Sequence, residues 1–406
     1  MRIDRTLELV RQGYPWARRF RGTADAAPTR LLGREAVVVG GPAGVRRFYD
    51  PRLRRQGSLP APIKLLLFGP GTVHGLDDAE HHHRKAMYLD LLTEDAVAAL
   101  GERAEREWER VVRHWAERDH VVLFDEAVRV LAASVFPWAG VPVAPEDLPR
   151  RARQLTAVLD GFAVPGPAYA RAVLARLRLG RWARRLVRGT RAGRIRPEPG
   201  TALHAAATAR DHDGRLLPER VAATAVLNVV RPTVAVAWFV AFAGRALHEH
   251  PEWRHRIAEG DEGPALAAFA QEVRRFYPFV PVLPARARER QDVLGVPVPR
   301  GGLVVLDVYG TLHDATRWPS PDRFDPSRFL TGDVDPDALV PQGGGEVRTG
   351  HRCPGESVTL TMITVAVRAL ARLPFTVPPQ DLGFDLSRVL TRPRSGVVLR
   401  LRHARS

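Results

Sequence analysis

The chain contains very little cysteine and very little lysine. Cys353 is the single cysteine among 406 residues, so a disulfide within the chain and a cysteine-rich zinc site are both excluded. Lys64 and Lys85 are the two lysines, and neither follows a glycine, which excludes a Gly-Lys phosphate-binding loop. A Gly-x-Ser-x-Gly nucleophile motif is absent as well. The three consecutive histidines at 81–83 cannot chelate one ion, because successive helical residues project about 100° apart.

Long apolar runs are also missing. We find none that approaches the roughly 18 residues needed to span a membrane. Residues 1–11 interrupt their apolar side chains with charges and lack the apolar core of a signal peptide. The sequence therefore predicts a cytoplasmic protein without a membrane span.

Acidic residues are outnumbered by basic ones. The 61 lysines and arginines exceed the 45 acidic residues and give a formal charge of +16. A strongly basic chain raises the possibility of nucleic-acid binding. The arginines are scattered in short clusters, however, and no zinc-finger, RNP or basic-zipper pattern accompanies them. We therefore interpret them as a solvated basic surface and expect no nucleic-acid partner.

What the sequence does contain is helical periodicity. Apolar residues recur at spacings of three and four in several segments, which predicts amphipathic helices. These segments are 95–117, 123–135, 149–162, 168–190, 217–248, 264–277 and 356–373. Short alternating stretches within 30–40 and 282–306 predict strands, and no repeat or linker divides the chain. The sequence therefore predicts one mainly α-helical domain over residues 1–406, with a minor β portion.

The single cysteine lies in a glycine-rich loop, residues 341–356, directly before the last predicted helix. The dipole and free N–H groups at a helix N-terminus lower the pKa of a thiol, and glycines let a flat cofactor approach the backbone. This setting suits a thiolate ligand to haem iron, which favours O–O cleavage. A structural cysteine in a turn fits the loop equally well.

Two further motifs precede this loop. Glu272 and Arg275 are one helical turn apart, where they can pair, and residues 318–329 form a run rich in proline, arginine and phenylalanine. In this order and spacing, the three motifs resemble the cytochrome P-450 superfamily over essentially the whole chain. The resemblance implies a triangular, mainly helical fold that holds b-type haem through Cys353. It also implies a buried network that joins Arg328 to Glu272 and Arg275.

The resemblance also assigns partners to the haem carboxylates, which need cationic or donor groups. His81 and Lys85 are four residues apart and so share one helix face. They match the family's His-x-x-x-Arg/Lys clamp, and His351 is a further match two residues before the cysteine. His82 and His83 have no matched role, and we expect them to be solvated.

The longest predicted helix departs from the general family. Oxygen-activating members carry an acid–alcohol pair there that delivers protons, whereas this chain has Arg231 and Pro232, with Thr233 one position late. Pro232 leaves the carbonyl of Asn228 unpaired, which predicts a kink. A charged residue that faces a haem pocket is costly unless it meets an anion.

The Arg-Pro pair resembles one branch, the bacterial fatty-acid peroxygenases. Further segments match that branch: 68–77, 271–278, 341–345 and 350–356.

The peroxygenase resemblance implies both a substrate and an oxidant. Arg231, next to Pro232, would bind the carboxylate of a long-chain fatty acid bidentately over the haem. That carboxylate would replace the acid–alcohol pair as general acid–base toward hydrogen peroxide, with no obligatory redox partner. Oxidation would then fall on the alpha or beta carbon. Phe68, Phe162 and residues near 279–283 are candidates for the lining of the acyl channel.

His74 bears on the product. In this branch the position is commonly glutamine in hydroxylases and histidine in members that decarboxylate fatty acids to terminal alkenes. A histidine near haem can donate a proton, whereas a packing histidine would leave the product ratio unchanged. We therefore expect alkene formation alongside alpha- and beta-hydroxylation.

Two other functions stay open at this point. A conventional monooxygenase would take electrons from ferredoxin or flavodoxin, whose acidic surfaces would suit this basic chain. Turnover with peroxide alone would distinguish the two enzymes. A non-enzymatic basic binding protein would be colourless when purified and would lack the Soret band of a reduced, CO-bound haem thiolate.

Overall fold

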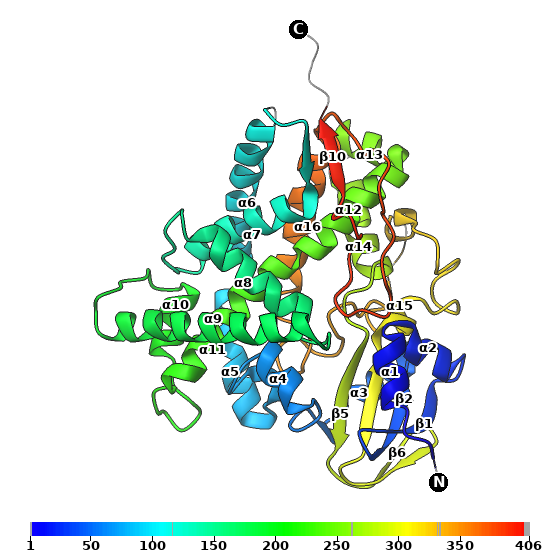
Figure 1. Ribbon diagram of the computed structural model, residues 1–406. Coiled ribbons are helices and arrows are strands. Elements are labelled where there is room, and N and C mark those ends of the chain that lie inside the picture. Colours follow the sequence, from blue (N-terminus) through cyan, green and yellow to red (C-terminus); the bar gives the residue numbers. More distant parts are fainter. Residues whose placement is uncertain (1, 116, 261–262, 331, 333, 402–406) are drawn as a thin grey trace.

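The computed structural model describes residues 2–115, 117–260, 263–330, 332 and 334–401. Helices make up most of the molecule, and the main strands gather at one corner together with the first helices of the chain (Figure 1). The prediction of a mainly α-helical fold with a minor β portion is confirmed.

The elements of the fold have the following bounds. The helices are α1 (Thr6–Gln12), α2 (Pro15–Arg21), α3 (Gly41–Phe48), α4 (Ala61–Leu67), α5 (Asp78–Leu91), α6 (Glu94–Trp115), α7 (Leu123–Trp138), α8 (Leu148–Gly161), α9 (Pro167–Arg191), α10 (Ala202–Thr208), α11 (Glu219–Ala235), α12 (Ala237–Glu249), α13 (Pro251–Ala258), α14 (Pro264–Phe276), α15 (Val308–Leu312) and α16 (Glu356–Arg372), with 3₁₀ turns η1 (Val73–Gly75) and η2 (Pro326–Phe329). The strands are β1 (Ala26–Leu31), β2 (Arg34–Val39), β3 (Leu53–Arg54), β4 (His120–Val122), β5 (Val282–Ala287), β6 (Gln291–Val293), β7 (Val296–Val298), β8 (Leu303–Asp307), β9 (Phe375–Thr376) and β10 (Val398–Leu401).

The main sheet has the strand order β1-β2-β8-β5-β3. β1 and β2 form a hairpin whose two turn residues, Leu32 and Gly33, have φ of 54° and 73°. Positive φ at both positions gives the turn that matches the twist of antiparallel strands. β2 then pairs in parallel with β8, so that Val37 lies opposite Val304, and the buried valines form a small core of their own. The strands predicted within 30–40 and 282–306 are therefore confirmed.

α11 and α12 run through the middle of the helical part. α7, α8, α9 and α10 pack on α11, and α7, α14 and α16 pack on α12. The stretch Glu219–Glu249 is long and apolar enough to cross a membrane by length and composition, and 89% of its apolar window is buried inside the protein. The prediction that no stretch approaches this length was wrong. A core helix enclosed on every side is apolar all round, as a membrane span is.

The predicted helix at 217–248 is interrupted once. α11 continues through Pro232 and ends at Ala235, and α12 begins at Ala237. Between them, Val236 donates its N–H to the carbonyl of Thr233 at 3.2 Å, which is a tighter turn than an α-helix makes. The interruption thus falls one turn after the proline that removes a helical hydrogen bond.

Six other predicted helices are found within a few residues of their expected bounds, as α6, α7, α8, α9, α14 and α16. The helices α1 to α4 were not predicted. Each has only seven or eight residues, which is too short for a helical period to show in the sequence.

A buried ion-pair network fixes α14 to the segment that precedes the cysteine loop. Arg275 donates to Glu272 through Nε at 2.6 Å and through Nη2 at 2.7 Å, and both side chains are fully buried. Arg275 Nη1 also donates to the carbonyls of Leu312 and Pro321. Arg328 Nε donates to Glu272 at 3.4 Å. The network that the family resemblance implied is therefore present.

Replacing Glu272 by glutamine is expected to lower the free energy of unfolding by about 3–5 kcal/mol, because Arg275 would keep a buried charge without a carboxylate partner. Urea unfolding of the haem-loaded protein measures this loss. Glu107→Gln is the matched control, since Glu107 pairs with Arg110 on the outer side of α6, and its loss should cost less than about 1 kcal/mol. Equal losses of unfolding free energy in the two variants would contradict a stabilising role of the buried network.

Candidate active site

Cys353 lies three residues before α16, at the end of the glycine-rich loop. Its N–H donates to the carbonyl of Gln342 at 3.3 Å, and Gln342 Nε2 donates to Cys353 Sγ at 3.8 Å. The same amide nitrogen donates to Thr359 Oγ1 on α16 at 2.9 Å. Arg274 Nη2 on α14 donates to Gln342 Oε1 at 3.1 Å. Gln342 therefore connects the sulfur atom to both α14 and α16.

The acidity of the Cys353 thiol differs from the expectation. Burial raises the pKa of Cys353 above its ordinary value, although the N–H of Gly355 and the charges of Lys85 and Arg274 act in the opposite direction. The prediction of a lowered pKa was wrong for the free thiol, because removal from water outweighs those favourable contacts. Binding to a metal ion deprotonates such a thiol.

The glycines at 343–345 lie against Tyr49. A Cβ atom on Gly343 would lie 2.7 Å from Tyr49 Oη, and one on Gly345 would lie 2.7 Å from the Tyr49 ring. The N–H of Gly344 donates to Tyr49 Oη at 2.8 Å. These glycines therefore make room for Tyr49, whose hydroxyl fastens the loop from the end of α3.

Basic groups from α5 and from the cysteine loop meet at one place. The rings of His81 and His351 lie with their centroids 3.9 Å apart. Lys85 Nζ donates to the carbonyls of Gly350 and Arg352, the latter at 2.8 Å. Burial lowers the pKa of His81 to about 3 and that of Lys85 to about 8. The structure thus brings together the three residues that the sequence assigned to the haem carboxylates.

Arg55 belongs to the same cluster and was missed at the level of the sequence. Burial lowers the pKa of Arg55 to about 10, and its guanidinium lies 4.1 Å from the centroid of the Phe48 ring. Its charge also lowers the pKa of His351, after the larger effect of burial. Asp77 supplies one carboxylate, with Oδ1 3.7 Å from His351 Nε2. Basic groups whose charge burial disfavours would gain from the two carboxylates of a haem.

Arg231 begins a chain of hydrogen bonds that ends at His74. Arg231 is 5% exposed and donates through Nη2 to Asn228 Oδ1 at 3.0 Å. Asn228 Nδ2 donates to Thr72 Oγ1 at 3.2 Å, and Thr72 Oγ1 lies 2.8 Å from His74 Nδ1. Because Thr72 accepts from Asn228, its own proton is available to His74 Nδ1. When Thr72 donates this proton to Nδ1, the neutral imidazole carries its own proton on Nε2.

Phe68 completes this group. The rings of Phe68 and His74 stack with centroids 4.0 Å apart, and the Arg231 guanidinium lies 5.5 Å from the Phe68 centroid. Burial first, and then the charge of Arg231, lowers the pKa of His74 to about 3, so that the ring is neutral at neutral pH. The structure therefore places three of the predicted residues together.

Three candidate residues face a space inside the protein. Pro232 is exposed although its neighbours Arg231 and Thr233 are buried, and His74 is exposed although burial dominates its pKa. Cys353 is partly exposed and yet its pKa is raised by burial. Accessible surface at these three residues, together with the thiol and the basic cluster, fits a haem bound at this place.

Phe162 makes no ring contact with Phe68 or His74 among the described residues. It caps the C-terminal end of α8 and is 9% exposed within the helical core. Phe279, at the start of the other proposed channel segment, stacks on Phe239 of α12 at 4.5 Å.

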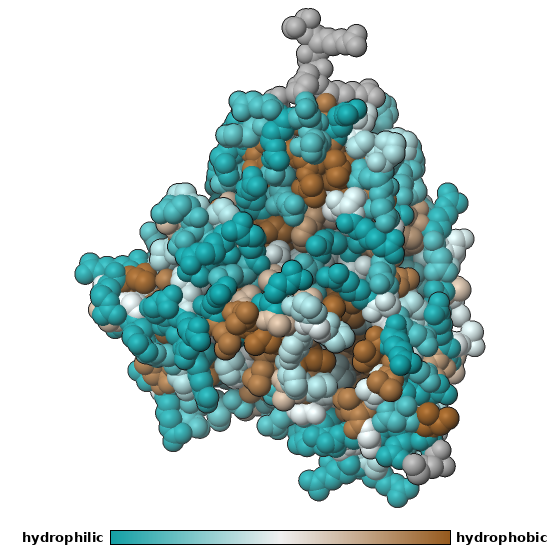
Figure 2. Space-filling model, in the orientation of Figure 1, coloured by the Kyte–Doolittle hydropathy of each residue, from teal (hydrophilic) through white to brown (hydrophobic). Residues whose placement is uncertain are grey.

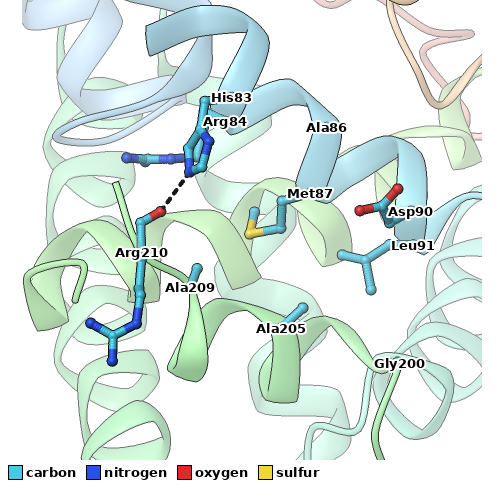
Figure 3. Close-up of a pocket in the computed structure, with 10 residues that line it drawn as sticks. All are labelled: His83, Arg84, Ala86, Met87, Asp90, Leu91, Gly200, Ala205, Ala209 and Arg210. Atoms are coloured by element: carbon cyan, nitrogen blue, oxygen red, sulfur yellow. Dashed lines mark hydrogen bonds between the residues drawn. The ribbon is translucent and has the colours of Figure 1, made fainter. Parts of the chain in front are cut away.

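A separate cavity of about 320 Å³ lies between α5 and the segment 200–210, and Figure 3 draws the residues that line it. His83 projects there from α5, and its Nε2 lies 2.9 Å from the carbonyl oxygen of Arg210 (Figure 3). His82 is exposed as expected, whereas His83 also ties α5 to residue 210. The residues assigned above to the candidate active site do not line this cavity.

Comparison with known proteins identifies part of the chain by sequence. The family model described as cytochrome P450 matches residues 255–396, which include α14 and Cys353. Cytochrome P450 4A7 of Oryctolagus cuniculus is 29% identical over 176 residues, which cover 39% of this chain and 34% of that protein. The matched part therefore spans about a third of the length of the curated relatives.

Solved structures match over nearly the whole chain. Cytochrome P450SP alpha (CYP152B1), in complex with (R)-ibuprophen, is 39% identical, covers 98% of both chains and has a TM-score of 0.94. Cytochrome P450EX alpha (CYP152N1), with myristic acid, is 37% identical over 98% of this chain and 96% of its own, with a TM-score of 0.93. A variant of cytochrome P450 OleT, in complex with arachidonic acid, is 35% identical over 99% and 98%, with a TM-score of 0.94. The chain is therefore a haem-thiolate protein of the cytochrome P450 family, and within that family it belongs with the CYP152 members.

Proposed function

We propose that this protein is a fatty-acid peroxygenase, which uses hydrogen peroxide to oxidise long-chain fatty acids at a haem iron bound by Cys353. The observation that carries the proposal is the environment of Arg231. This buried cation bonds to Asn228, and among the described residues no carboxylate contacts it. A buried charge without a partner is costly. A fatty-acid carboxylate would supply that partner in the bidentate geometry that guanidinium favours.

The ligands of similar proteins support the substrate class. Two of the structures that resemble this chain contain fatty acids, namely myristic acid in cytochrome P450EX alpha and arachidonic acid in the OleT variant. The enclosed cavity next to Phe68, with apolar ring pairs such as Phe239 and Phe279 beside α12, suits an acyl chain. We infer that Phe68 and Phe162 contribute to the lining of that channel.

The proposed chemistry assigns a role to each part of the site. When bound, the haem supplies an iron centre whose thiolate ligand favours cleavage of the O–O bond of peroxide. Arg231 holds the substrate carboxylate, and that carboxylate moves a proton between the two peroxide oxygens in place of an acidic side chain. Pro232 has no N–H, so the carbonyl of Asn228 loses its helical hydrogen-bond donor one turn before the proline. His81, Lys85, His351 and Arg55 would bind the haem carboxylates.

The same anchoring permits two products. In hydroxylation, fatty acid and hydrogen peroxide give a hydroxy acid and one water molecule. In decarboxylation, the same reactants give a terminal alkene, carbon dioxide and two water molecules. We infer that His74 favours the second product, because its hydrogen bond with Thr72 leaves the Nε2 proton available in the cavity.

We further infer that residues 1–406 act as one domain in the cytoplasm without an obligatory redox partner. The site draws on residues from Arg55 to Cys353, so the chemistry cannot be assigned to a smaller part of the chain. The apolar stretch Glu219–Glu249 is mostly buried, which supports a core role rather than a membrane role.

Removing the thiol should remove the thiolate spectrum. Cys353→Ala is expected to lose the Soret band that a thiolate-bound, reduced, CO-complexed haem gives. Gln342→Leu is the control, because it removes the N–H donor to the sulfur but keeps the sulfur. This variant should keep the band and lower the reduction potential of the iron. A thiolate band in Cys353→Ala would contradict the assignment of the ligand.

Removing the guanidinium should remove substrate binding. Arg231→Ala is expected to weaken fatty-acid affinity by roughly tenfold to a hundredfold, because a charge-assisted bidentate contact is lost. Peroxide-driven oxidation should fall with it while haem is retained. Titration of the substrate-induced spectral shift and product analysis measure the two effects. Arg231→Lys keeps the positive charge but not the planar pair of N–H donors. Its fatty-acid affinity should therefore lie between those of wild type and Arg231→Ala. Unchanged turnover of fatty acids in Arg231→Ala would refute the role.

The His74 side chain should set the ratio of products. His74→Gln is expected to lower the alkene-to-hydroxy-acid ratio, and a difference of about 1.4 kcal/mol between the two barriers suffices for a tenfold change. Thr72→Val should lower the ratio in the same direction, since it removes the hydroxyl that fixes the His74 tautomer. Thr72→Ser keeps the hydroxyl and is the control. Mass spectrometry of the products over a series of chain lengths measures the ratio. An identical ratio in wild type and His74→Gln would leave His74 a packing residue.

A further inference from the structure

A second arginine, Arg176, lies close to Arg231 but belongs to another helix. It is partly exposed on α9, which packs along α11. Its guanidinium occupies the space beside Gly69, where a Cβ atom would lie 1.7 Å from Arg176 Nη2 and 2.9 Å from Thr224 Oγ1. Gly69 directly follows Phe68 and has a φ of 92°, so the chain has a residue without a side chain at this contact. The absence of a side chain at position 69 therefore makes room for Arg176.

Arg176 has no anionic partner in the part of the chain that the structure describes. No hydrogen bond or ion pair to its guanidinium is present there, and burial alone accounts for the lowering of its pKa to about 10. Two other arginines of α9 have hydrogen-bond partners. Arg188 pairs with Glu219, and Arg191 donates to the carbonyls of residues 207 and 217. Arg176 is thus largely removed from water, and no carboxylate among the described residues offsets the cost.

The charges of Arg176 and Arg231 act on each other. Burial first, and then the Arg176 charge, lowers the pKa of Arg231 to about 9. Thr224, next to Arg176, precedes Asn228 by four residues and Arg231 by seven, so the three lie on one face of α11 within two helical turns. Arg231 Nε is buried and has no hydrogen-bond partner among the described residues. One face of α11 therefore meets two guanidinium groups and no carboxylate.

Apolar rings lie on the other side of Arg231 from Thr224, on α12, which begins two residues after the end of α11. Phe239, eight residues after Arg231, stacks on Phe279 at 4.5 Å. An acyl chain that extends from Arg231 toward these rings runs away from Arg176. A fatty acid with one carboxylate would then neutralise Arg231 and leave Arg176 unpaired. The site has one more positive charge than a simple fatty acid can balance.

We propose that Arg176 is a second carboxylate-binding residue beside Arg231, and that the pocket takes a fatty acid with two carboxylates at its head, such as an alkyl-substituted succinate. One carboxylate binds Arg231 and the other binds Arg176, while the alkyl chain lies along the apolar side. The inference depends on the proposed function for the role of Arg231. It adds a substrate class that carries a second negative charge next to the carbon atoms to be oxidised.

The experiment compares two ligands that differ only in that charge. Dodecylsuccinic acid is myristic acid with a carboxymethyl group on its alpha carbon. Isothermal titration calorimetry of the haem-loaded protein gives the dissociation constant of each ligand, independently of peroxide turnover. We expect the succinate to bind at least about tenfold more tightly, because the second contact is a charge-assisted hydrogen bond. Arg176→Met should abolish this difference and leave the affinity for myristic acid unchanged.

Arg178→Met is the matched control, since Arg178 lies two residues further along α9 and is exposed. It should keep the full preference, and Arg176→Lys, which retains a positive charge, should keep part of it. If Arg176→Met fails to fold, Arg176→Gln replaces it. An equal loss of affinity for both ligands would overturn the proposal, because Arg176 would then serve the first carboxylate or the Phe68 loop. Equal affinity of wild type for the two ligands would overturn it as well.

The outcomes also separate this inference from the proposed function. If peroxide does not drive oxidation but the preference for the succinate depends on Arg176, the proposed function fails and the second site stands. If myristic acid is oxidised normally and no preference is found, the second site fails and the proposed function stands.

Discussion

Two adjacent arginines on α14 hold the cysteine loop in place. Arg275 bonds to Glu272 and to carbonyls of the segment before the loop, while Arg274 bonds to Gln342 and Glu356 within it. Both are almost completely buried. Interior charges are tolerated only when every one of them is paired and hydrogen-bonded. Because each guanidinium is paired with a carboxylate, Glu272 or Glu356, the position of Cys353 is determined by a rigid scaffold instead of by a free loop.

Arg231 and Arg176, in contrast, are not paired with carboxylates in the described part of the chain. Arg231 and Arg176 are removed from water to a large extent, yet no carboxylate among the described residues contacts either of them. The same physical rule that makes α14 a stable support therefore makes the pocket an attractive place for an anion. A ligand carboxylate completes the electrostatics that the fold leaves incomplete (a trade of stability for binding that is common at functional sites).

The fold has a sheet-containing corner and a larger helical part. The main sheet and the first helices form one corner, and the long helices α6, α7, α11, α12 and α16 form the rest (Figure 1). On the face shown in Figure 2 the surface is largely hydrophilic, with hydrophobic residues in separate patches. Arginines lie both on the surface, as Arg178 does, and in the interior, as Arg274 and Arg275 do. What distinguishes the interior arginines is their partners and not their number.

The sequence by itself determined the helical class, the long helices and the resemblance carried by Glu272, Arg275 and Cys353. These features depend on local periodicity and on fixed spacing, which survive without coordinates. Other features depended on contacts between distant segments. Thr72 meets Asn228 across 156 positions, and Gln342 reaches the sulfur only because the loop folds back on itself. The direction of the Cys353 pKa also depended on the tertiary structure, because desolvation is a property of all surrounding atoms and not of the residues next to the thiol in the chain.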